Sequence, residues 1–525
     1  MTAYAPQLGS RLGLSHTQLN VIGLSGNIGV YGSAPLWGRI VDTRGPRMLL
    51  IMAFCTLIIG YSGIRHYYDR GLIQGTSTLS TFDISVLVLF GFLTGIGGNG
   101  GLAGAMNSTA KSWPDRARAT ANGIVISGFG LSAFLFSTMA HIFFPGNTSD
   151  FLLVLAVGTS IPMLLGFFLV RPIPLQQSEI SHDPENEALE EAFDSQTSVG
   201  VASPSLFVRE NDSQTHLLSP HPPHVHADEE ELADPPLLEE TVPAIHVHHP
   251  SRYGVLNISG RALFASADFW LLFTITALLS GTGLMYINNV GSISQALFAK
   301  GNPNYDEGKA AQLQASQVSI VSIMNCLGRV SIGMLADFTK SFLKLPRSFC
   351  LPLIACIFII SQITCYYVED VGALWKASAL LGAAYGAMFG LFPTIVIEWF
   401  GLPHFSENWG FVSLSPMIGS NIFSIAFGRN LDAHAPPSSP VANVTSLPET
   451  AHFVQLLQRA GLPSTSQCLE GRTCYADSLK LTIAACCVAL GLAVYSGWRD
   501  RRRQMRIALK GAEIAPEVVW EVAEE

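Results

Sequence analysis

The fold is decided at residues 38–47, which read Gly38-Arg39-Ile40-Val41-Asp42-Thr43-Arg44-Gly45-Pro46-Arg47. This polar stretch lies between two apolar runs, at about 17–38 and 48–65. Each run approaches the length of about 20 mostly apolar residues that a bilayer crossing requires. Gly45-Pro46 favours a tight turn. The stretch therefore predicts a short basic connection between two membrane-spanning helices.

The composition extends this prediction to most of the chain. Of the 525 residues, 49% are apolar and 13% are charged, and the mean hydropathy is +0.35. A soluble protein would carry roughly 25% charged residues. Nine cysteines are too few for a disulfide scaffold of this length. We therefore expect a polytopic membrane protein.

About eleven apolar runs are long enough to span a bilayer. They lie near 17–38, 48–65, 84–106, 120–144, 150–170, 267–290, 314–336, 349–367, 373–396, 408–428 and 476–498. A strand barrel would show short alternating segments instead of long continuous runs. The sequence predicts an all-α fold.

Basic residues mark alternate connections between these runs, which predicts that those connections face the cytosol. They are Arg39, Arg44, Arg47, Lys111, Arg116, Arg118, Lys340, Lys344, Arg347, Arg499, Arg501, Arg502, Arg503 and Arg506. The 429–475 loop then lies on the lumenal or extracellular side. It holds the glycosylation sequon at Asn443, and the pair Cys468 and Cys474 suits an oxidising compartment. We expect Asn443 to be glycosylated and the two cysteines to form a disulfide.

The chain is expected to have four regions. Residues 1–170 form a first transmembrane bundle and 171–262 an acidic, histidine-rich, disordered cytosolic linker, because such a composition cannot bury enough apolar surface. Residues 263–498 form a second bundle, and 499–525 a cytosolic tail. The histidines of the linker could bind metal, but a solvated linker is the simpler interpretation.

The two predicted bundles contain similar sequence patterns at corresponding positions. Gly38 and Asp42 close the first run, and Gly333 and Asp337 close the seventh with the same spacing. Parallel repeats separated by a cytosolic linker are typical of a secondary transporter built from two bundles.

The 38–47 stretch resembles the loop signature of the major facilitator superfamily. Tyr4-Ala5-Pro6-Gln7-Leu8 and Leu14-Ser15-His16-Thr17-Gln18-Leu19-Asn20 are similar to its nodulin-like, monocarboxylate-permease-related branch of fungi and plants. The resemblance implies a fold of six plus six spans, with residues 4–8 ending a span that begins upstream. We therefore expect that Met1 is internal to the true reading frame, or that this form is truncated.

The signature has a physical interpretation of its own. Asp42 can cap the N-terminus of a neighbouring helix and pair with Arg44 or Arg47, while Gly38 lets two helices approach closely. The resemblance implies that such contacts gate one access state. The gating candidates are Gly38, Asp42, Arg44, Arg47, Gly333 and Asp337. A static loop that carries positive-inside charges is the alternative.

Arg329 is the main ionisable residue inside a predicted span. It lies one helical turn before Gly333, and Asn325 lies one turn deeper on the same face. The pattern resembles the carboxylate-binding segment of monocarboxylate permeases, where an aspartate and an arginine four residues apart precede a glycine. Here Asn325 stands in place of the acid, and Val330 in place of the usual proline, so proton coupling through that acid is not expected. A gating or snorkelling arginine is the alternative.

Other polar side chains in the spans could hydrogen-bond a small solute or join helices. The further substrate-binding candidates are Asn27, Tyr31, Asn99, Tyr286, Asn289 and Tyr385. Gly95-Ile96-Gly97-Gly98-Asn99-Gly100 fits a dinucleotide motif, but it lies inside an apolar span without a strand-turn-helix unit, so helix packing is favoured.

The leading hypothesis is a secondary transporter for a small organic solute, such as a monocarboxylate or another organic anion. A non-transporting sensor or scaffold of the same fold and a metal-ion transporter are the rivals. No P-loop, catalytic triad or metal-ligand cluster is visible in the spans, so we expect no enzyme, no cofactor and no bound metal. The expected partners are the lipid bilayer and a small-molecule solute, with proton coupling left open, and no nucleic acid. A dileucine-like segment at 234–238 and the branch resemblance favour the vacuolar membrane over the plasma membrane.

Overall fold

The computed structural model describes residues 4–14, 16–72, 79–144, 147–171, 257–300, 306–434 and 470–514. Across these ranges the regular structure is helical throughout, with no strand. The histidine-rich linker, Asn443 and Cys468 lie outside the described residues.

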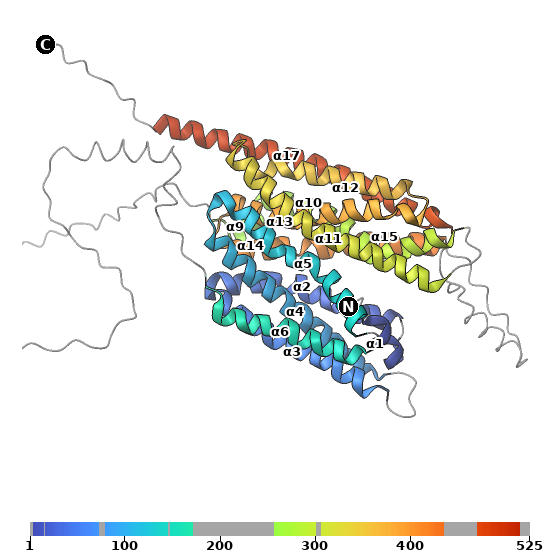
Figure 1. The fold of residues 1–525 in the computed structure, drawn as a ribbon. Coiled ribbons are helices and arrows are strands. Elements are labelled where there is room, and N and C mark those ends of the chain that lie inside the picture. Colours follow the sequence, from blue (N-terminus) through green and yellow to red (C-terminus); the bar gives the residue numbers. More distant parts are fainter. Residues whose placement is uncertain are drawn as a thin grey trace, which may run out of the picture. The chain divides into compact units, whose positions relative to one another are not determined.

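The first half contains one short helix and five long ones. They are α1 (Ala5–Leu12), α2 (His16–Arg44), α3 (Pro46–Arg70), α4 (Thr81–Ser112), α5 (Asp115–Phe143) and α6 (Thr148–Leu169). Helix α4 packs on both α2 and α3, and α6 packs on α3 (Figure 1). Glycines of α4 make these contacts close: a Cβ added at Gly95 would collide with the Gly26 carbonyl group. This is the helix-packing role expected for the glycine-rich run.

The second half repeats this plan with more interruptions. Its α-helices are α9 (Arg261–Ala265), α10 (Ala267–Ala299), α11 (Glu307–Ser341), α12 (Cys350–Tyr367), α13 (Trp375–Phe400), α14 (Phe405–Val412), α15 (Ser415–Ala433) and α17 (Ala476–Ile514), with short 3-10 turns η1 (Arg347–Phe349), η2 (Val371–Ala373) and η3 (Gly471–Cys474). Helix α11 packs on α13, α10 on α15, and α12 on α17 and α13. The largest apolar core lies in this half.

Local sequence signals explain where the helices begin. The side chains of Ser80, Asn147, Ser266 and Asp306 each accept a hydrogen bond from a backbone N–H of the helix that follows. Between α2 and α3, Gly45 has φ +80°, which a glycine adopts without strain. Pro46 then occupies the first position of α3.

The expected spans are confirmed with two corrections. Ten helical segments of the described residues are long and apolar enough to cross a membrane. Of the eleven expected, α2 is the one that falls below this hydropathy limit, although it has 29 residues. The predicted 408–428 run is broken between Val412 and Ser415, because Pro416 follows and cannot donate the N–H that would continue the helix.

Two features of the described residues lie across the predicted region boundaries at 262 and 499, and these boundaries stay predictions. Helix α17 continues through the predicted start of the tail at 499 and ends at Ile514. The predicted linker ends at 262, whereas Ile258 already belongs to the second half, where its N–H donates to the Phe400 carbonyl at 2.9 Å.

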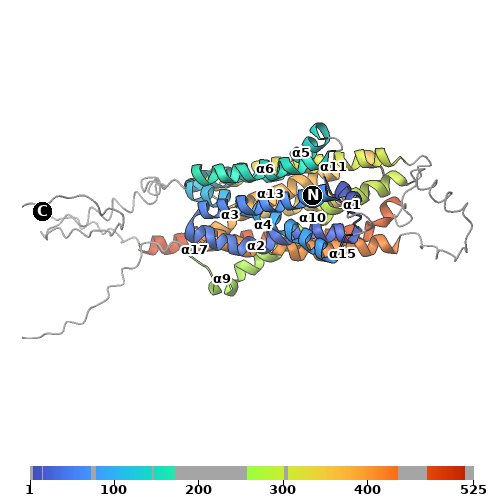
Figure 2. The ribbon, with the colours of Figure 1, turned by 90° about the horizontal axis from the view of Figure 1, so that it is seen from below.

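The two halves meet along two helix pairs, α5 with α11 and α2 with α14, and the long helices run side by side (Figure 2). Both pairs carry their charged contacts at one end, which we call the basic end. It comprises Asp42, Lys111, Asp115, Asp337, Lys340, Arg347 and Glu398.

Candidate functional site

Arg329 lies inside α11 and is 3% exposed. Its Nε donates to Asn325 Oδ1 at 3.0 Å, and a terminal nitrogen donates to the Ile126 carbonyl of α5 at 3.1 Å. Within the described ranges, no carboxylate lies within salt-bridge distance of this guanidinium. A buried charge that is held by neutral acceptors alone is costly. The site therefore leaves positive charge uncompensated.

Aromatic rings complete the surroundings of Arg329. Its guanidinium lies 5.4 Å from the ring centroid of Phe129 and 5.6 Å from that of Phe389, within the range of cation–π attraction. The side chains of Tyr31 and Tyr385 interact with each other and lie close enough to Arg329 to interact with its charge. The walls of the site thus come from α2, α5, α11 and α13.

The structure brings together four of the predicted binding residues, Arg329, Asn325, Tyr31 and Tyr385, and separates the other four. The Tyr286 hydroxyl is bonded to Ser378 at 2.8 Å inside the second half, and Asn99 donates to Ser33 at 3.3 Å. Asn289 donates to the Met285 carbonyl of its own helix at 2.7 Å, and Asn27 is exposed.

Three groups at this site were not predicted from the sequence: Phe129, Phe389 and the Ile126 carbonyl. The chain has 30 phenylalanines, so composition alone gives these two no signal. A glycine pattern could have indicated the approach of α5 to α11, because a Cβ added at Gly130 would lie 3.0 Å from the Cys326 nitrogen. That approach is what brings the Ile126 carbonyl to Arg329.

The first contact at the basic end is centred on Asp42 of α2. Its carboxylate accepts hydrogen bonds from Asn107 Nδ2 at 2.7 Å and from the backbone N–H of Glu407 at 2.9 Å. Glu407 lies in the first turn of α14, so Asp42 caps a helix of the other half. Lys111 Nζ lies 3.4 Å away. We call this contact the Asp42 latch.

The expected pairing of Asp42 with Arg44 or Arg47 is wrong. Arg44 is exposed, and Arg47 Nε donates to the Val170 carbonyl at 3.4 Å. Arg44 lies two residues after Asp42 on α2, a spacing that does not place two side chains on one helix face, and Arg47 belongs to α3. Lys111 of α4 and Asn107 take their place.

The second contact is centred on Asp337 of α11, which is the repeat counterpart of Asp42. Its carboxylate accepts from the backbone N–H of Thr120 at 2.7 Å and from that of Ala119 at 3.3 Å, both in α5. Arg347, which is fully buried, donates to Asp337 at 2.8 Å and to Glu398 at 2.6 Å, and lies 3.2 Å from Asp115 of α5.

Lys340 joins the same cluster, at 2.5 Å from Asp115 and 2.9 Å from Glu398. Arg118 lies 3.0 Å from Asp115. We call this network of three carboxylates and three cations the Asp337 latch. The sequence predicted Asp337 from its spacing, but it did not predict Asp115 or Glu398, because no local pattern shows which distant charges meet.

Glycines allow both helix crossings. A Cβ added at Gly38 would overlap the backbone of Ser406 and lie 2.7 Å from Glu407 Cα. A Cβ at Gly333 would lie 2.6 Å from the Ala119 carbonyl oxygen. The two predicted glycines therefore lie where the backbones of the two halves touch.

These two helix bundles and their loop signature agree with a match to known proteins. The family model of the Major Facilitator Superfamily matches residues 1–424. The chain belongs to the major facilitator superfamily. Members of this superfamily are membrane transporters and not enzymes, so this chain is a membrane-embedded transporter of that family.

Relatives of this superfamily chain come from fungi. An uncharacterized membrane protein of Saccharomyces cerevisiae, YMR155W, is 25% identical, with 82% of this chain and 83% of the relative covered. A protein of Wickerhamomyces anomalus named "Probable transporter MCH1" is 26% identical, with 89% and 83% covered.

Among solved structures, the superfamily fold is shared with the proton:xylose symporter XylE. The TM-score is 0.52 at 14% identity, with 93% of this chain and 90% of the symporter covered. This likeness supports the fold.

Several predicted features lie on residues that the structure does not describe. Asn443 and Cys468 are among them. Cys474 is disulfide-bonded. Because Cys468 lies outside the described residues, the pairing of these two cysteines stays a prediction. In the described part of the chain, no group of three or more His, Cys, Asp or Glu side chains could hold a metal ion.

Proposed function

We propose that this protein is a secondary transporter that moves a small organic anion, of which a monocarboxylate is the simplest example, by alternating access. The observation that carries the proposal is the buried Arg329, which is held by Asn325 and the Ile126 carbonyl and by no carboxylate of the described residues. Arginine binds a carboxylate through two parallel hydrogen bonds.

The bond from Arg329 to Ile126 also links the two halves, because α11 donates and α5 accepts. A solute carboxylate is a stronger acceptor than a backbone carbonyl. A solute that takes over this donor would therefore weaken the contact between α5 and α11 at the centre of the bundle. Solute binding is in this way connected to movement of the halves.

The two latches supply the other part of alternating access. We propose that the basic end faces the cytosol and that this conformation is closed there, since both latches join the halves at that end. The arginines and lysines of the basic end follow the positive-inside rule. Opening to the cytosol then requires both latches to break.

Further assignments belong to the same proposal. We place the protein in the vacuolar membrane, with Asn443 glycosylated on the lumenal side and Cys468 paired with Cys474. Relatives named as probable transporters MCH1 support a transport role. The source of energy is a solute or proton gradient.

A binding measurement tests the proposal. Purified protein is titrated with short organic acids and with neutral sugars, and binding is followed by thermal shift. We expect an organic acid to bind, Arg329→Lys to weaken binding roughly tenfold or more, and Arg329→Ala to abolish it, because a hydrogen bond to a charged group contributes about 1.5–3 kcal/mol.

Asn289→Ala is the matched control, because that amide bonds to its own helix and should leave binding unchanged. If organic acids bind Arg329→Ala as tightly as they bind the unaltered protein, Arg329 is not the anion site.

A further inference from the structure

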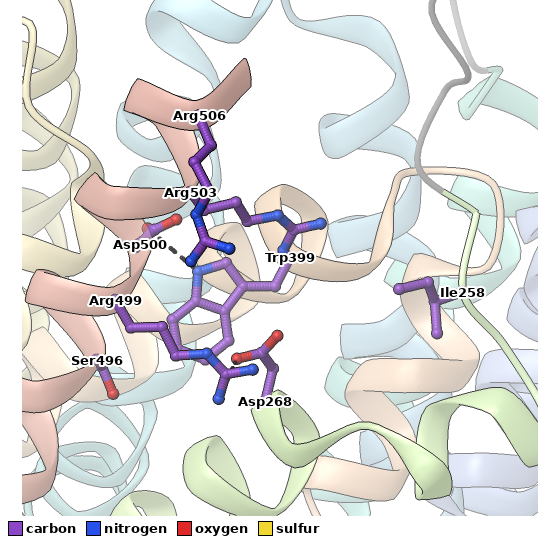
Figure 3. A pocket seen from close by; sticks show the side chains of 8 residues that line it. All are labelled: Ile258, Asp268, Trp399, Ser496, Arg499, Asp500, Arg503 and Arg506. Atoms are coloured by element: carbon purple, nitrogen blue, oxygen red, sulfur yellow. Dashed lines mark hydrogen bonds and ion pairs between the residues drawn. The ribbon is translucent and has the colours of Figure 1, made fainter. Parts of the chain in front are cut away.

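A cavity beside the Asp337 latch is lined by other residues than either latch or the Arg329 site. Its Trp399 follows Glu398, and its Asp500 accepts a hydrogen bond from Ser348, the neighbour of Arg347. Its volume is about 430 Å³, and it opens between α10, α13 and α17 (Figure 3). It is lined by Ile258, Asp268, Trp399, Ser496, Arg499, Asp500, Arg503 and Arg506. Three of the lining residues are arginines and one is a tryptophan. This composition suits an anionic, partly apolar ligand.

The charges of this cavity are not balanced. Arg499 lies 3.1 Å from Asp268, and Asp500 accepts hydrogen bonds from Ser348 at 2.6 Å and from Trp399 at 3.3 Å. These contacts engage both carboxylates. Arg503 and Arg506 lie within salt-bridge distance of no carboxylate in the described ranges. Three guanidinium groups against two carboxylates leave an excess of positive charge.

The cavity lies where α17 passes from apolar to arginine-rich sequence. On α17 the apolar part of the helix ends at Tyr495 and Trp498, which are about half exposed, as is Trp270 of α10. Exposed tryptophan and tyrosine at helix ends mark the interface between membrane and water. The arginines of the cavity begin immediately after this aromatic belt.

We propose that this cavity binds the phosphate headgroup of an anionic phospholipid from the leaflet at the basic end. Arg503 and Arg506 supply guanidinium groups that match a phosphate. The exposed rings of Trp270 and Trp498 lie at the level of the glycerol and upper acyl chains. Basic pockets between membrane helices bind such headgroups in this way.

A bound headgroup would connect three helices of the second half, since Asp268 lies on α10, Trp399 on α13 and the arginines on α17. A ligand that binds the folded state alone raises its stability. The lipid is therefore expected to raise the thermal unfolding midpoint of the whole protein, independently of any transported solute.

The test compares two full-length double variants of equal charge change. Arg503→Gln with Arg506→Gln removes the cavity arginines. Arg44→Gln with Arg501→Gln is the control, because both arginines are exposed and neither lines the cavity. Each protein is titrated with micelles or nanodiscs of phosphatidylcholine alone, of phosphatidylcholine with phosphatidylserine, and with soluble inorganic phosphate.

We expect phosphatidylserine to raise the unfolding midpoint of the unaltered protein and of the control. The cavity variant should lose roughly tenfold or more in lipid affinity, as expected for two arginines near an anionic surface. Equal losses in both double variants would show general surface attraction and overturn the proposal.

Two other results would also overturn it. If inorganic phosphate stabilises the protein as well as phosphatidylserine does, the ligand is free phosphate. If phosphatidylserine raises the unfolding midpoint of the unaltered protein no more than phosphatidylcholine alone does, the cavity binds no anionic headgroup.

Discussion

Arg329 is the residue on which the proposed chemistry depends. A charged group at mid-bilayer costs about 2.5–3.5 kcal/mol on insertion scales, and here its partners are an amide, a carbonyl and two rings. A carboxylate solute would supply the missing negative charge. Because Asn325 is neutral, it leaves the charge of Arg329 available to an anionic solute. An aspartate at position 325 would compete with the solute for that charge.

This competition gives a prediction for Asn325→Asp. An ionised Asp at position 325 would pair with Arg329 and oppose an anionic solute, while a protonated one would not. Uptake by this variant should therefore rise as the pH falls, more steeply than uptake by the unaltered protein. Initial uptake rates between pH 5 and pH 8 would check it, and parallel pH profiles would contradict it.

Individual residues also show how far the sequence could predict the site. The spacing of Asn325, Arg329 and Gly333 on one helix face follows from helical periodicity, so it could be predicted. The meeting of Arg329 with Tyr31 and Phe389 depends on how α2 and α13 pack. Asn99 and Tyr286 are polar residues in the spans, as Tyr31 is, but they hydrogen-bond to partners inside their own bundles.

At the scale of elements, the two latches share one arrangement but differ in the side chains that complete it. Both place a carboxylate from the end of one helix on backbone N–H groups of the other half. The Asp337 latch adds a buried arginine and two more acids, whereas the Asp42 latch uses an amide and the partly exposed Lys111. The Asp337 latch should be the stronger of the two.

Asp337→Asn should loosen the contact between α5 and α11 at the basic end. Arg347 is fully buried, and loss of one partner from a buried ion pair destabilises by about 3–5 kcal/mol. A cysteine introduced at Thr120 should then react faster with a water-soluble maleimide. Asp477→Asn is the control, because the Asp477–Lys480 pair is exposed, and no increase should follow from it. An unchanged rate at position 120 in Asp337→Asn would show that the latch does not hold this state.

Gly38→Ala should have a similar effect on the other helix pair. The added methyl group would overlap the Ser406 backbone, and overpacking of this kind costs about 1–3 kcal/mol. A spin-label distance between α2 and α14 should lengthen.

Gly128→Ala is the matched control for this change, since an added Cβ there meets nothing within 4 Å. The interpretation fails if Gly38→Ala and Gly128→Ala leave the α2–α14 distance equally short.

At the scale of the whole molecule, the sequence predicted the helices better than their meeting points. Long apolar runs and positive-inside charges are local signals, and the expected helices formed with shifted ends. The break after Val412 follows from Pro416, and the predicted span nevertheless stands as one segment, Phe405–Leu431. The network of Asp115, Glu398 and Arg347 joins residues that are far apart in the sequence, and no local pattern contains that information.

Uptake by purified protein in liposomes tests the central claim most directly. The protein is reconstituted in an inward proton gradient and, separately, with an internal pool of unlabelled solute, and entry of labelled short organic acids is followed. The account predicts saturable uptake of an organic anion that is lost in Arg329→Ala and kept in Asn289→Ala. Binding of the anion without any entry, or entry that Arg329→Ala leaves unchanged in rate and affinity, would contradict it.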